Sequence, residues 1–253
     1  MILISPKLLV LLAASGYSEK PVPLPWSLGT EYRYVWIQNG KRVGETWFRF
    51  KRDSKAAGAP AKRKTRYILK AKRENDYPDF SVRAQETTTV RADGTPIRFE
   101  ETLTGKSLDE KDFNQETQIH FEGSTAKLRY KQRGRDQKPH DVEIPQGTFI
   151  IATDTVEHWA LFLSMLPPGF QKREVQLLYP DFAVVMSTTI EKAGQEKLKI
   201  GTDEVESTRY TFLSKRKQLT GVLWLDASRR LLQIEFANKN PALTLRVVLS
   251  ELK

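Results

Sequence analysis

The sequence contains no cysteine in its 253 residues and only three histidines, His120, His140 and His158. The absence of cysteine excludes disulfide bonds, thiol catalysis, iron–sulfur clusters and every zinc site with sulfur ligands. Three separated histidines disfavour a histidine-rich metal site as well. No run of residues approaches the roughly 20 apolar positions of a membrane-spanning helix. The composition fits an ordinary folded domain for which we expect no cofactor.

The positive charge is concentrated in one segment of the chain. Lys and Arg outnumber Asp and Glu by 41 to 31, which gives a net charge of +10. Residues 49–73 alone contain 11 basic residues and one acid, Asp53, so this segment also sums to +10. The rest of the chain is neutral overall. A negatively charged partner is therefore expected to meet this one element.

Residues 1–18 have the layout of a secretory signal peptide. Lys7 precedes an apolar run at residues 8–14, and the small residues Ala14, Ser15 and Gly16 offer a cleavage site. The alternative is an apolar strand or a buried helical turn. We expect a periplasmic or secreted protein, without a lipid anchor because no cysteine follows the run. Residues 19–29 are predicted to be an extended lead-in and residues 30–253 a single domain.

From residue 31 onward, the hydrophobic pattern has a period of two residues, which is typical of β-strands. Asn39 and Gly40 predict a hairpin turn. A continuous apolar face requires Trp36 to lie opposite Gly44, which predicts a three-residue connection with Gly40 or Lys41 at positive φ. Similar runs predict some fourteen short strands. No period of 20–50 residues repeats, which disfavours a propeller or a solenoid.

One segment has helical spacing instead. Apolar residues recur every three or four positions between residues 156 and 166, and Pro167-Pro168-Gly169 follows. This pattern predicts one helix over about residues 152–166. The predicted fold class is mainly β: a single long antiparallel sheet curled into an open half-barrel over this central helix.

Several motifs carry a resemblance to a known group of proteins. They are the aromatic strand, NG turn and Gly44 within residues 31–50, then Leu166-Pro167-Pro168-Gly169, and finally GVLWLD at residues 221–226 with RRLL at residues 229–232. With these motifs, the sequence resembles a family of uncharacterised bacterial envelope proteins that is similar to the LolA and LolB lipoprotein carriers. The resemblance implies an open β half-barrel with a hydrophobic groove between sheet and helix that can take acyl chains.

Aromatic and aliphatic residues on the predicted inward faces are the candidate lining of such a groove. A curled sheet covered by one short helix leaves apolar concave surface, which usually marks a binding site. The alternative is that these residues simply pack as core. The first hypothesis is a non-enzymatic envelope protein that binds a lipid or another hydrophobic ligand. The candidate lining residues are Tyr32, Tyr34, Trp36, Phe48, Phe50, Tyr67, Leu69, Trp159, Phe162 and Leu163.

The basic hairpin at residues 49–73 is a second candidate site. Strand alternation predicts that its basic residues face outward when its aromatic residues face inward. Like charges on neighbouring strands destabilise a sheet, so the second hypothesis is docking on an anionic membrane or an acidic envelope protein. The alternative is a charged edge that prevents aggregation. Nucleic acid is disfavoured, since only Trp47 would be available for base stacking. The predicted docking residues are Arg49, Lys51, Lys64, Arg66, Lys70 and Lys72.

Catalytic motifs are missing from the sequence. It has no G-x-S-x-G elbow, no Walker loop and no dinucleotide fingerprint. Asp154, Glu157 and His158 cluster at the predicted helix start, which could suggest acid–base chemistry. The preferred interpretation is that Asp154 caps or favours the helix N-terminus while Glu157 and His158 are solvated or edge residues. No catalytic residue is predicted.

Overall fold

The computed structural model describes residues 24–53, 65–107, 112–152, 155–215, 219–237 and 244–251. The predicted signal peptide, the first part of the predicted lead-in, Lys64 and Asp154 lie outside the described residues.

Sixteen strands of the described chain form one sheet. Its order is β10-β11-β12-β13-β14-β15-β16-β1-β2-β3-β4-β5-β6-β7-β8, and β9 also pairs with β7. The neighbours are antiparallel except for the parallel pair β10 and β11. The strands are β1 (Glu31–Gln38), β2 (Lys41–Arg52), β3 (Arg66–Asp76), β4 (Phe80–Arg91), β5 (Pro96–Ser107), β6 (Asp112–Glu122), β7 (Thr125–Gln132), β8 (Arg135–Asp136), β9 (His140–Glu143), β10 (Phe149–Ile150), β11 (Lys172–Tyr179), β12 (Val184–Ile200), β13 (Asp203–Ser214), β14 (Thr220–Leu225), β15 (Leu231–Ala237) and β16 (Thr244–Leu249).

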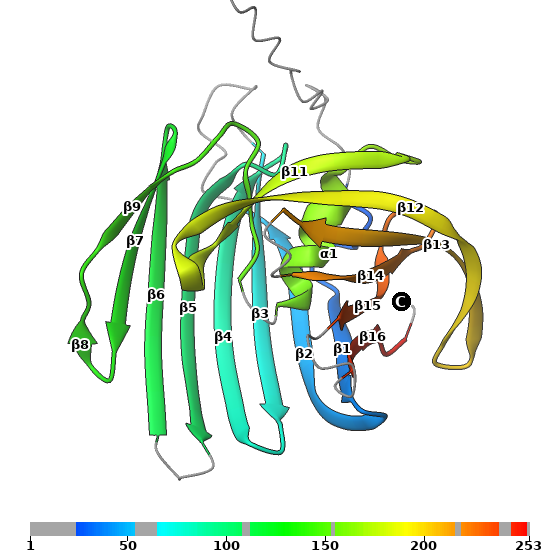
Figure 1. Ribbon diagram of the computed structural model, residues 1–253, viewed down its shortest axis with the longest axis horizontal. Helices are drawn as coiled ribbons and strands as arrows, with labels where there is room; N and C mark the ends of the chain where they lie inside the picture. Colours follow the sequence, from blue (N-terminus) through cyan, green and yellow to red (C-terminus); the bar gives the residue numbers. More distant parts are fainter. Residues whose placement is uncertain are drawn as a thin grey trace, which may run out of the picture.

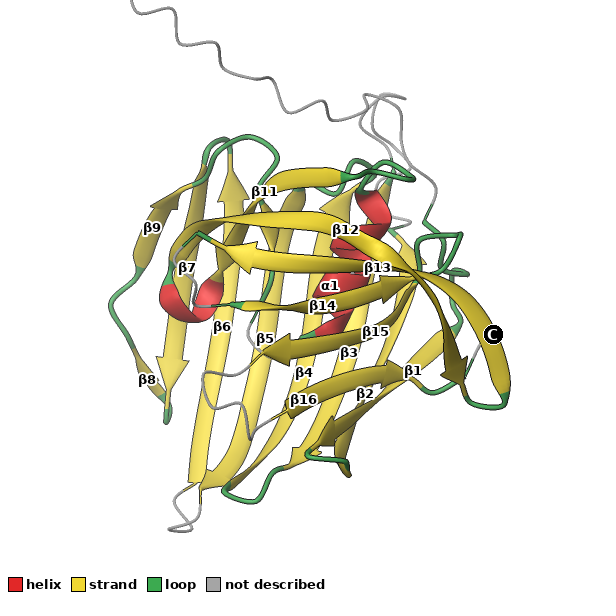
Figure 2. Cartoon of the chain, turned by 45° about the vertical axis from the view of Figure 1, so that its right-hand side comes forward, coloured by secondary structure: helices red, strands yellow, loops and turns green. Residues whose placement is uncertain are grey.

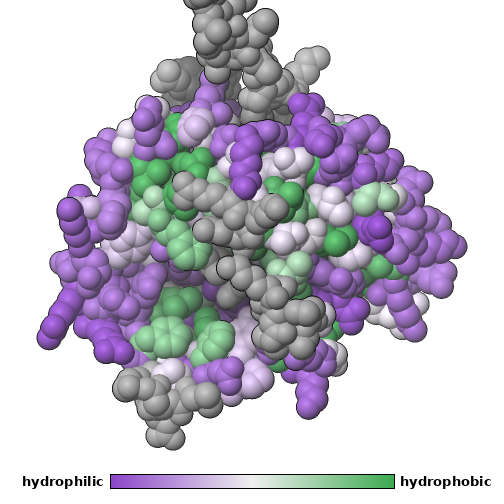
Figure 3. Space-filling model, viewed as in Figure 1, coloured by the Kyte–Doolittle hydropathy of each residue, from purple (hydrophilic) through white to green (hydrophobic). Residues whose placement is uncertain are grey.

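The sheet curls around a single α-helix, α1 (Val156–Met165), in the part of the chain that the structure describes. In Figures 1 and 2 the helix lies between the long strands β3–β6 and the crossing strands β11–β15. The two ends of the sheet approach each other, because Phe99 and Leu128 pack in one buried cluster with Ile150 and Leu178. The predicted fold class, an open β half-barrel over one helix, is confirmed. The face seen in Figure 3 shows hydrophobic residues near its centre and hydrophilic residues along its rim.

Helix α1 is shorter at its start than the predicted range of 152–166. Residues 149 and 150 belong to β10, and Thr155 has extended backbone angles as the N-cap residue. The Thr155 hydroxyl donates to the carbonyl of Ala152 at 2.7 Å, which holds the connection from β10. The helix ends at Met165, as the prolines at 167 and 168 predict. All ten of its residues are buried, so it is a central plug and not a surface helix.

The first hairpin confirms the predicted pairing of Trp36 with Gly44 and places the extra residue elsewhere than expected. Asn39 and Gly40 have φ of 50° and 77° and form a two-residue turn, since Gln38 pairs with Lys41. The register shift lies after Trp36, in the strand and not in the turn. Gly44 has no space for a side chain, because a Cβ would lie 2.3 Å from the carbonyl oxygen of Glu74 on β3.

Candidate functional site

The ten residues predicted to line a groove lie in the core. Nine of them are 0–2% exposed, and Tyr67 is partly buried against the same cluster. Trp26 packs its ring edge against Tyr32 at 4.8 Å and against Phe48 at 5.4 Å. Trp159 on α1 meets Phe212 of β13 at 4.7 Å. These rings therefore pack as core between sheet and helix and do not line an open groove. This is the alternative interpretation of the sequence.

The basic residues of the hairpin lie on the outer face of β2 and β3. The buried side chains of Phe48, Phe50 and Leu69 point inward, and the residues between them point outward. On β4, the exposed Arg91 joins this face, which the sequence analysis missed. We call this surface the cationic face. Its described members are Arg49, Lys51, Arg66, Lys70, Lys72 and Arg91, all of them exposed.

Two pairs of like charges lie directly opposite each other on the cationic face. Arg49 faces Lys70 across β2 and β3, and Arg66 faces Arg91 across β3 and β4. Lys72 is paired with Glu74 at 2.5 Å. Within the described ranges, no ion pair is formed by the other five cations. Such cross-strand pairs cost stability of a few tenths of a kcal/mol or more each, so folding alone does not explain them.

An aromatic residue lies within this charged surface. The Trp47 ring has the Arg33 guanidinium 5.9 Å from its centroid and the Lys72 ammonium at 5.7 Å. Trp47 is half-buried, as is Ile68, which faces Lys51 across β2 and β3. The surface thus combines cations with two apolar side chains, the composition of membrane-interface anchors.

A second polar arrangement lies inside the molecule, where α1 meets β4. His158 Nε2 is 2.8 Å from Glu86 Oε1 and 2.9 Å from Thr88 Oγ1, and His158 Nδ1 accepts a hydrogen bond from the Ala152 backbone N–H at 3.0 Å. His158 and Glu157 are each 1% exposed. The expectation that they are solvated is therefore wrong. The curled sheet covers the start of the helix, which its local sequence could not indicate.

This arrangement ties the helix to the sheet and does not form a hydrolytic triad. In such a triad the nucleophile and the acid meet opposite nitrogens of the imidazole. Here Thr88 and Glu86 meet the same nitrogen, and the other nitrogen is held by the Ala152 backbone. All three side chains are buried at 0–5% exposure.

An ion pair next to this arrangement joins β3 to β5. Arg73 Nη2 lies 3.5 Å from Glu101 Oε1, and both side chains are almost fully buried. Burial raises the pKa of Glu101 to about 7 although Arg73 opposes this rise. Burial also disfavours ionisation of Glu86, yet His158, Arg73 and Thr88 hold the pKa of Glu86 below its usual range. The interior therefore holds one carboxylate that stays ionised and a second that titrates near neutral pH.

Glu157 makes the stability of the protein depend on pH. Its Oε2 is buried without a hydrogen-bond partner among the described residues, and burial together with Glu86 raises its pKa to about 8. Because the pKa of Glu157 is higher in the folded state than in the unfolded state, where it is 4.5, its protonation stabilises the fold fully at pH values below 4.5. This stabilisation is lost as the pH rises through about 8. The loss is on the order of 4 kcal/mol over this range.

We expect Glu157→Gln to remove this part of the pH dependence, because glutamine mimics the protonated carboxyl. The variant should match the wild type near pH 5 and exceed it in stability near pH 8. Chemical denaturation across this range measures the difference in unfolding free energy. The control is Glu204→Gln, an exposed residue of β13. Equal curves for wild type and Glu157→Gln would contradict the burial of an unpartnered carboxyl.

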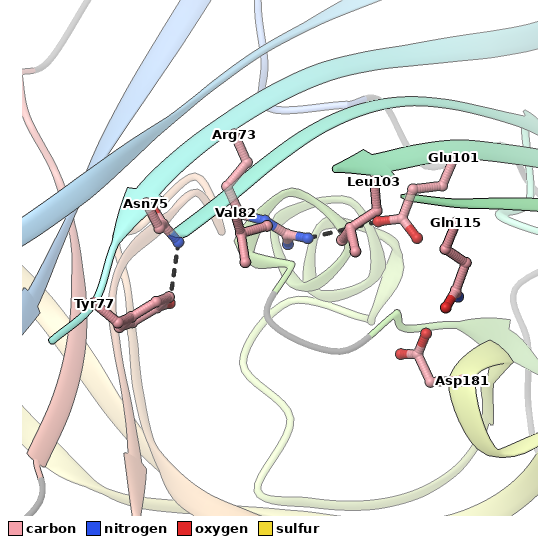
Figure 4. Close-up of a pocket in the computed structure, with 8 residues that line it drawn as sticks. All are labelled: Arg73, Asn75, Tyr77, Val82, Glu101, Leu103, Gln115 and Asp181. Atoms are coloured by element: carbon pink, nitrogen blue, oxygen red, sulfur yellow. Dashed lines mark hydrogen bonds and ion pairs between the residues drawn. The ribbon is translucent and has the colours of Figure 1, made fainter. Parts of the chain in front are cut away.

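A polar pocket of about 200 Å³ opens beside the Arg73–Glu101 pair on the inner side of β3–β6. Figure 4 shows Glu101, Gln115 and Asp181 converging at one end, with Asn75 and Tyr77 at the other. Asp181 belongs to the 3₁₀-helix η3 (Pro180–Phe182), which follows β11, so the pocket joins both parts of the curled sheet.

Comparisons with known proteins bear on the fold. No family model matches the chain, and no curated protein matches it. A solved β-barrel-like protein of the domain family DUF1849 from Brucella abortus is 12% identical with a TM-score of 0.55 and covers 90% of this chain and 99% of that chain. The two proteins share a fold. At this identity, the likeness supports nothing beyond the fold.

Two further solved structures are more distant. A DUF1089 family protein from Pseudomonas aeruginosa is 11% identical, covers 74% of this chain and 87% of that chain, and has a TM-score of 0.40. The hypothetical lipoprotein YmcC from Escherichia coli is 10% identical, covers 88% and 87%, and has a TM-score of 0.29. None of these three structures is described as LolA or LolB, so the resemblance to the lipoprotein carriers stays a prediction.

The described residues contain neither a membrane-spanning helix nor a cluster of metal ligands. No helix there is long and apolar enough to cross a membrane. No group of three or more His, Cys, Asp or Glu side chains is arranged there to hold a metal ion.

Proposed function

We propose that this protein is a non-enzymatic module of the cell envelope that docks on anionic lipid surfaces through its cationic face. The observation that carries the proposal is the pairing of Arg49 with Lys70 and of Arg66 with Arg91 on an exposed sheet face. A negatively charged surface relieves the mutual repulsion of these pairs. Glu31 on β1 lies opposite Arg49, but none of the four cations forms an ion pair among those of the described chain.

The strength of such docking follows from the number of free cations. Each Lys or Arg near an anionic bilayer contributes about 1 kcal/mol. Five cations of the face are without an ion pair in the described chain, so their sum supports reversible attachment. Trp47 favours a lipid surface over an acidic protein as the partner, because the amphipathic indole ring is suited to the headgroup region, and Ile68 adds a second apolar contact.

Lipid carriage inside the barrel is the competing function, and the packed core disfavours it. An acyl chain between sheet and helix would displace rings such as Trp36 and Trp159, which are 0% and 1% exposed. Removing buried aromatic contacts of this kind costs about 3–5 kcal/mol for each ring. The proposal therefore assigns the lipid to the outer surface.

Vesicle sedimentation tests the proposal. We expect the wild type to bind vesicles of phosphatidylcholine with one-third phosphatidylglycerol at least about tenfold more tightly than pure phosphatidylcholine vesicles. The difference should disappear at high salt, because exposed charges are screened. Equal binding to both vesicles would refute docking by charge. Binding to polyglutamate without binding to vesicles would replace the membrane by an acidic protein partner.

A further inference from the structure

The polar pocket beside Arg73 continues into a second one. The second pocket has a volume of about 290 Å³ and shares Gln115 and Asp181 with the first. It extends along β7 and η3. Its other lining residues are Tyr130, Gln132, Gln137, His140, Phe182 and Ala183. Together the two pockets reach the range of about 300–1,000 Å³ that small-molecule sites occupy.

Side-chain amides dominate the polar lining of this combined pocket. Asn75 and Gln115 line the first part, and Gln132 and Gln137 line the second. Each amide offers donors and an acceptor together. A hydroxyl group also donates and accepts, so a ligand with many hydroxyls can satisfy such a lining from either side.

The charges of the pocket favour a neutral ligand. Arg73 is the only lysine or arginine among its described lining residues, and Glu101 lies 3.5 Å from it. Asp181 adds a second carboxylate. Arg73 and Glu101 offset each other, and Asp181 repels an anion, so a neutral ligand is favoured over a phosphate or a carboxylate.

Aromatic rings lie at both ends of the pocket. Tyr77 stacks on Phe80 with ring centroids 4.6 Å apart, and Tyr130 meets His140 edge-on at 6.0 Å. The Tyr130 hydroxyl donates to the carbonyl of Pro180 at 2.5 Å, which fixes its ring at the wall. Phe182 is 65% exposed at the rim. Apolar ring faces pack well against the C–H faces of a sugar.

We propose that this combined pocket is a binding site for a neutral sugar, with room for a disaccharide. Gln115 and Asp181 lie where the two parts join and contact the ligand's hydroxyl groups, while Tyr77 and Tyr130 face its rings. The site lies on the inner side of β3–β7, so the inference is independent of the docking proposed for the outer cationic face.

Saturation-transfer NMR with the full chain tests the inference. The probes are glucose, galactose, N-acetylglucosamine, cellobiose, lactose and chitobiose, with glucose 6-phosphate for comparison. We expect transfer to at least one neutral sugar and weaker transfer to glucose 6-phosphate than to glucose. Gln115→Leu should weaken binding at least about tenfold, because it removes a hydrogen bond from a partly buried amide to the ligand. Asp181→Asn should also weaken binding, because a charge-assisted hydrogen bond becomes a neutral one.

Gln118→Leu is the matched control. Gln118 lies on the same strand, β6, but is exposed on the opposite face, so this variant should bind the sugar as the wild type does. Circular dichroism and thermal unfolding establish that each variant is folded, and Asp181→Asn keeps the side-chain shape if Gln115→Leu does not fold. The inference is overturned if no sugar of the panel gives a signal with the wild type. It is also overturned if Gln115→Leu and Gln118→Leu bind alike.

Discussion

Reversing the charge of both like-charged pairs is expected to abolish binding to anionic vesicles, with a loss of more than about 100-fold at low salt. The variant combines four substitutions, each of which removes one attractive charge and adds a repulsive one. Its fold should persist, since the residues are exposed and both like-charged pairs remain pairs of like charges. Arg49→Glu adds one repulsive contact, with Glu31 across β1 and β2, at a cost of a few tenths of a kcal/mol. Vesicle sedimentation measures the loss. The four substitutions are Arg49→Glu, Arg66→Glu, Lys70→Glu and Arg91→Glu.

A half-reversed variant is the matched control for this prediction. Lys70→Glu with Arg91→Glu turns both like-charged pairs into complementary ones and leaves Arg49 opposite Glu31, so the folded state should gain a few tenths of a kcal/mol for each pair. Vesicle binding should still fall, though less than in the fourfold variant. A more stable protein with weaker binding would separate function from folding. If the fourfold variant binds as the wild type does, the cationic face is not the docking surface.

Replacing Arg73 by methionine is expected to lower the free energy of unfolding by about 3–5 kcal/mol near pH 8. The guanidinium lies 3.5 Å from Glu101, and its loss leaves an unpaired carboxylate in the interior. The loss should be smaller near pH 6. With Arg73 present, the pKa of Glu101 is already about 7, and without the cation it rises further, so the carboxyl becomes neutral at the lower pH.

Two variants control for this prediction. Arg73→Met combined with Glu101→Gln removes both charges and should recover most of the lost stability, because an isolated buried charge costs more than its pair contributes. Arg98→Met removes the partner of Glu100, an exposed pair on the same strand as Glu101, and should cost at most about 1 kcal/mol. A loss for Arg73→Met that is equally large at pH 6 and pH 8 would show that the charge of Glu101 is not its cause.

The local alternation of apolar and polar residues was sufficient to predict the strands of the sheet. The alternation around Trp36 and Gly44 predicted the register of the first hairpin, and the outward position of Arg49 and Lys70 followed from the same alternation. The sequence also predicted that the helix ends before Pro167. These features depend on neighbours along the chain or across one turn, where side-chain direction is fixed by backbone geometry.

The interior charges were not predicted in the same way, although the alternation contained a signal for them. Arg73 lies four residues after the inward Leu69, and Glu86 lies four before the inward Val90. Strand parity therefore points both side chains inward, against the usual exposure of charged residues. Burial of these two charges depends on their ion-pair partners. The partners lie on β5 and α1, and only the curling of the sheet brings them near.

The pocket depends on contacts between residues that lie still farther apart in the sequence. Gln115 lies on β6 and Asp181 on η3, 66 positions later in the chain, and they meet because the two ends of the sheet approach each other. No periodicity within either segment contains that information. The same curling brings His158 of α1 to Glu86, where the sequence analysis expected a solvated helix start.

The most direct test of the account is to locate the surface that contacts the membrane. The chain has no cysteine, so a single introduced cysteine carries a single environment-sensitive fluorophore. Thr87→Cys places the label on β4 opposite Lys70, within the cationic face, and Thr211→Cys places it on an exposed position of β13. On addition of phosphatidylglycerol vesicles, the account predicts a blue shift of emission for the label at position 87 and none for the label at position 211. An unchanged spectrum at position 87, or equal shifts at both positions, would contradict it.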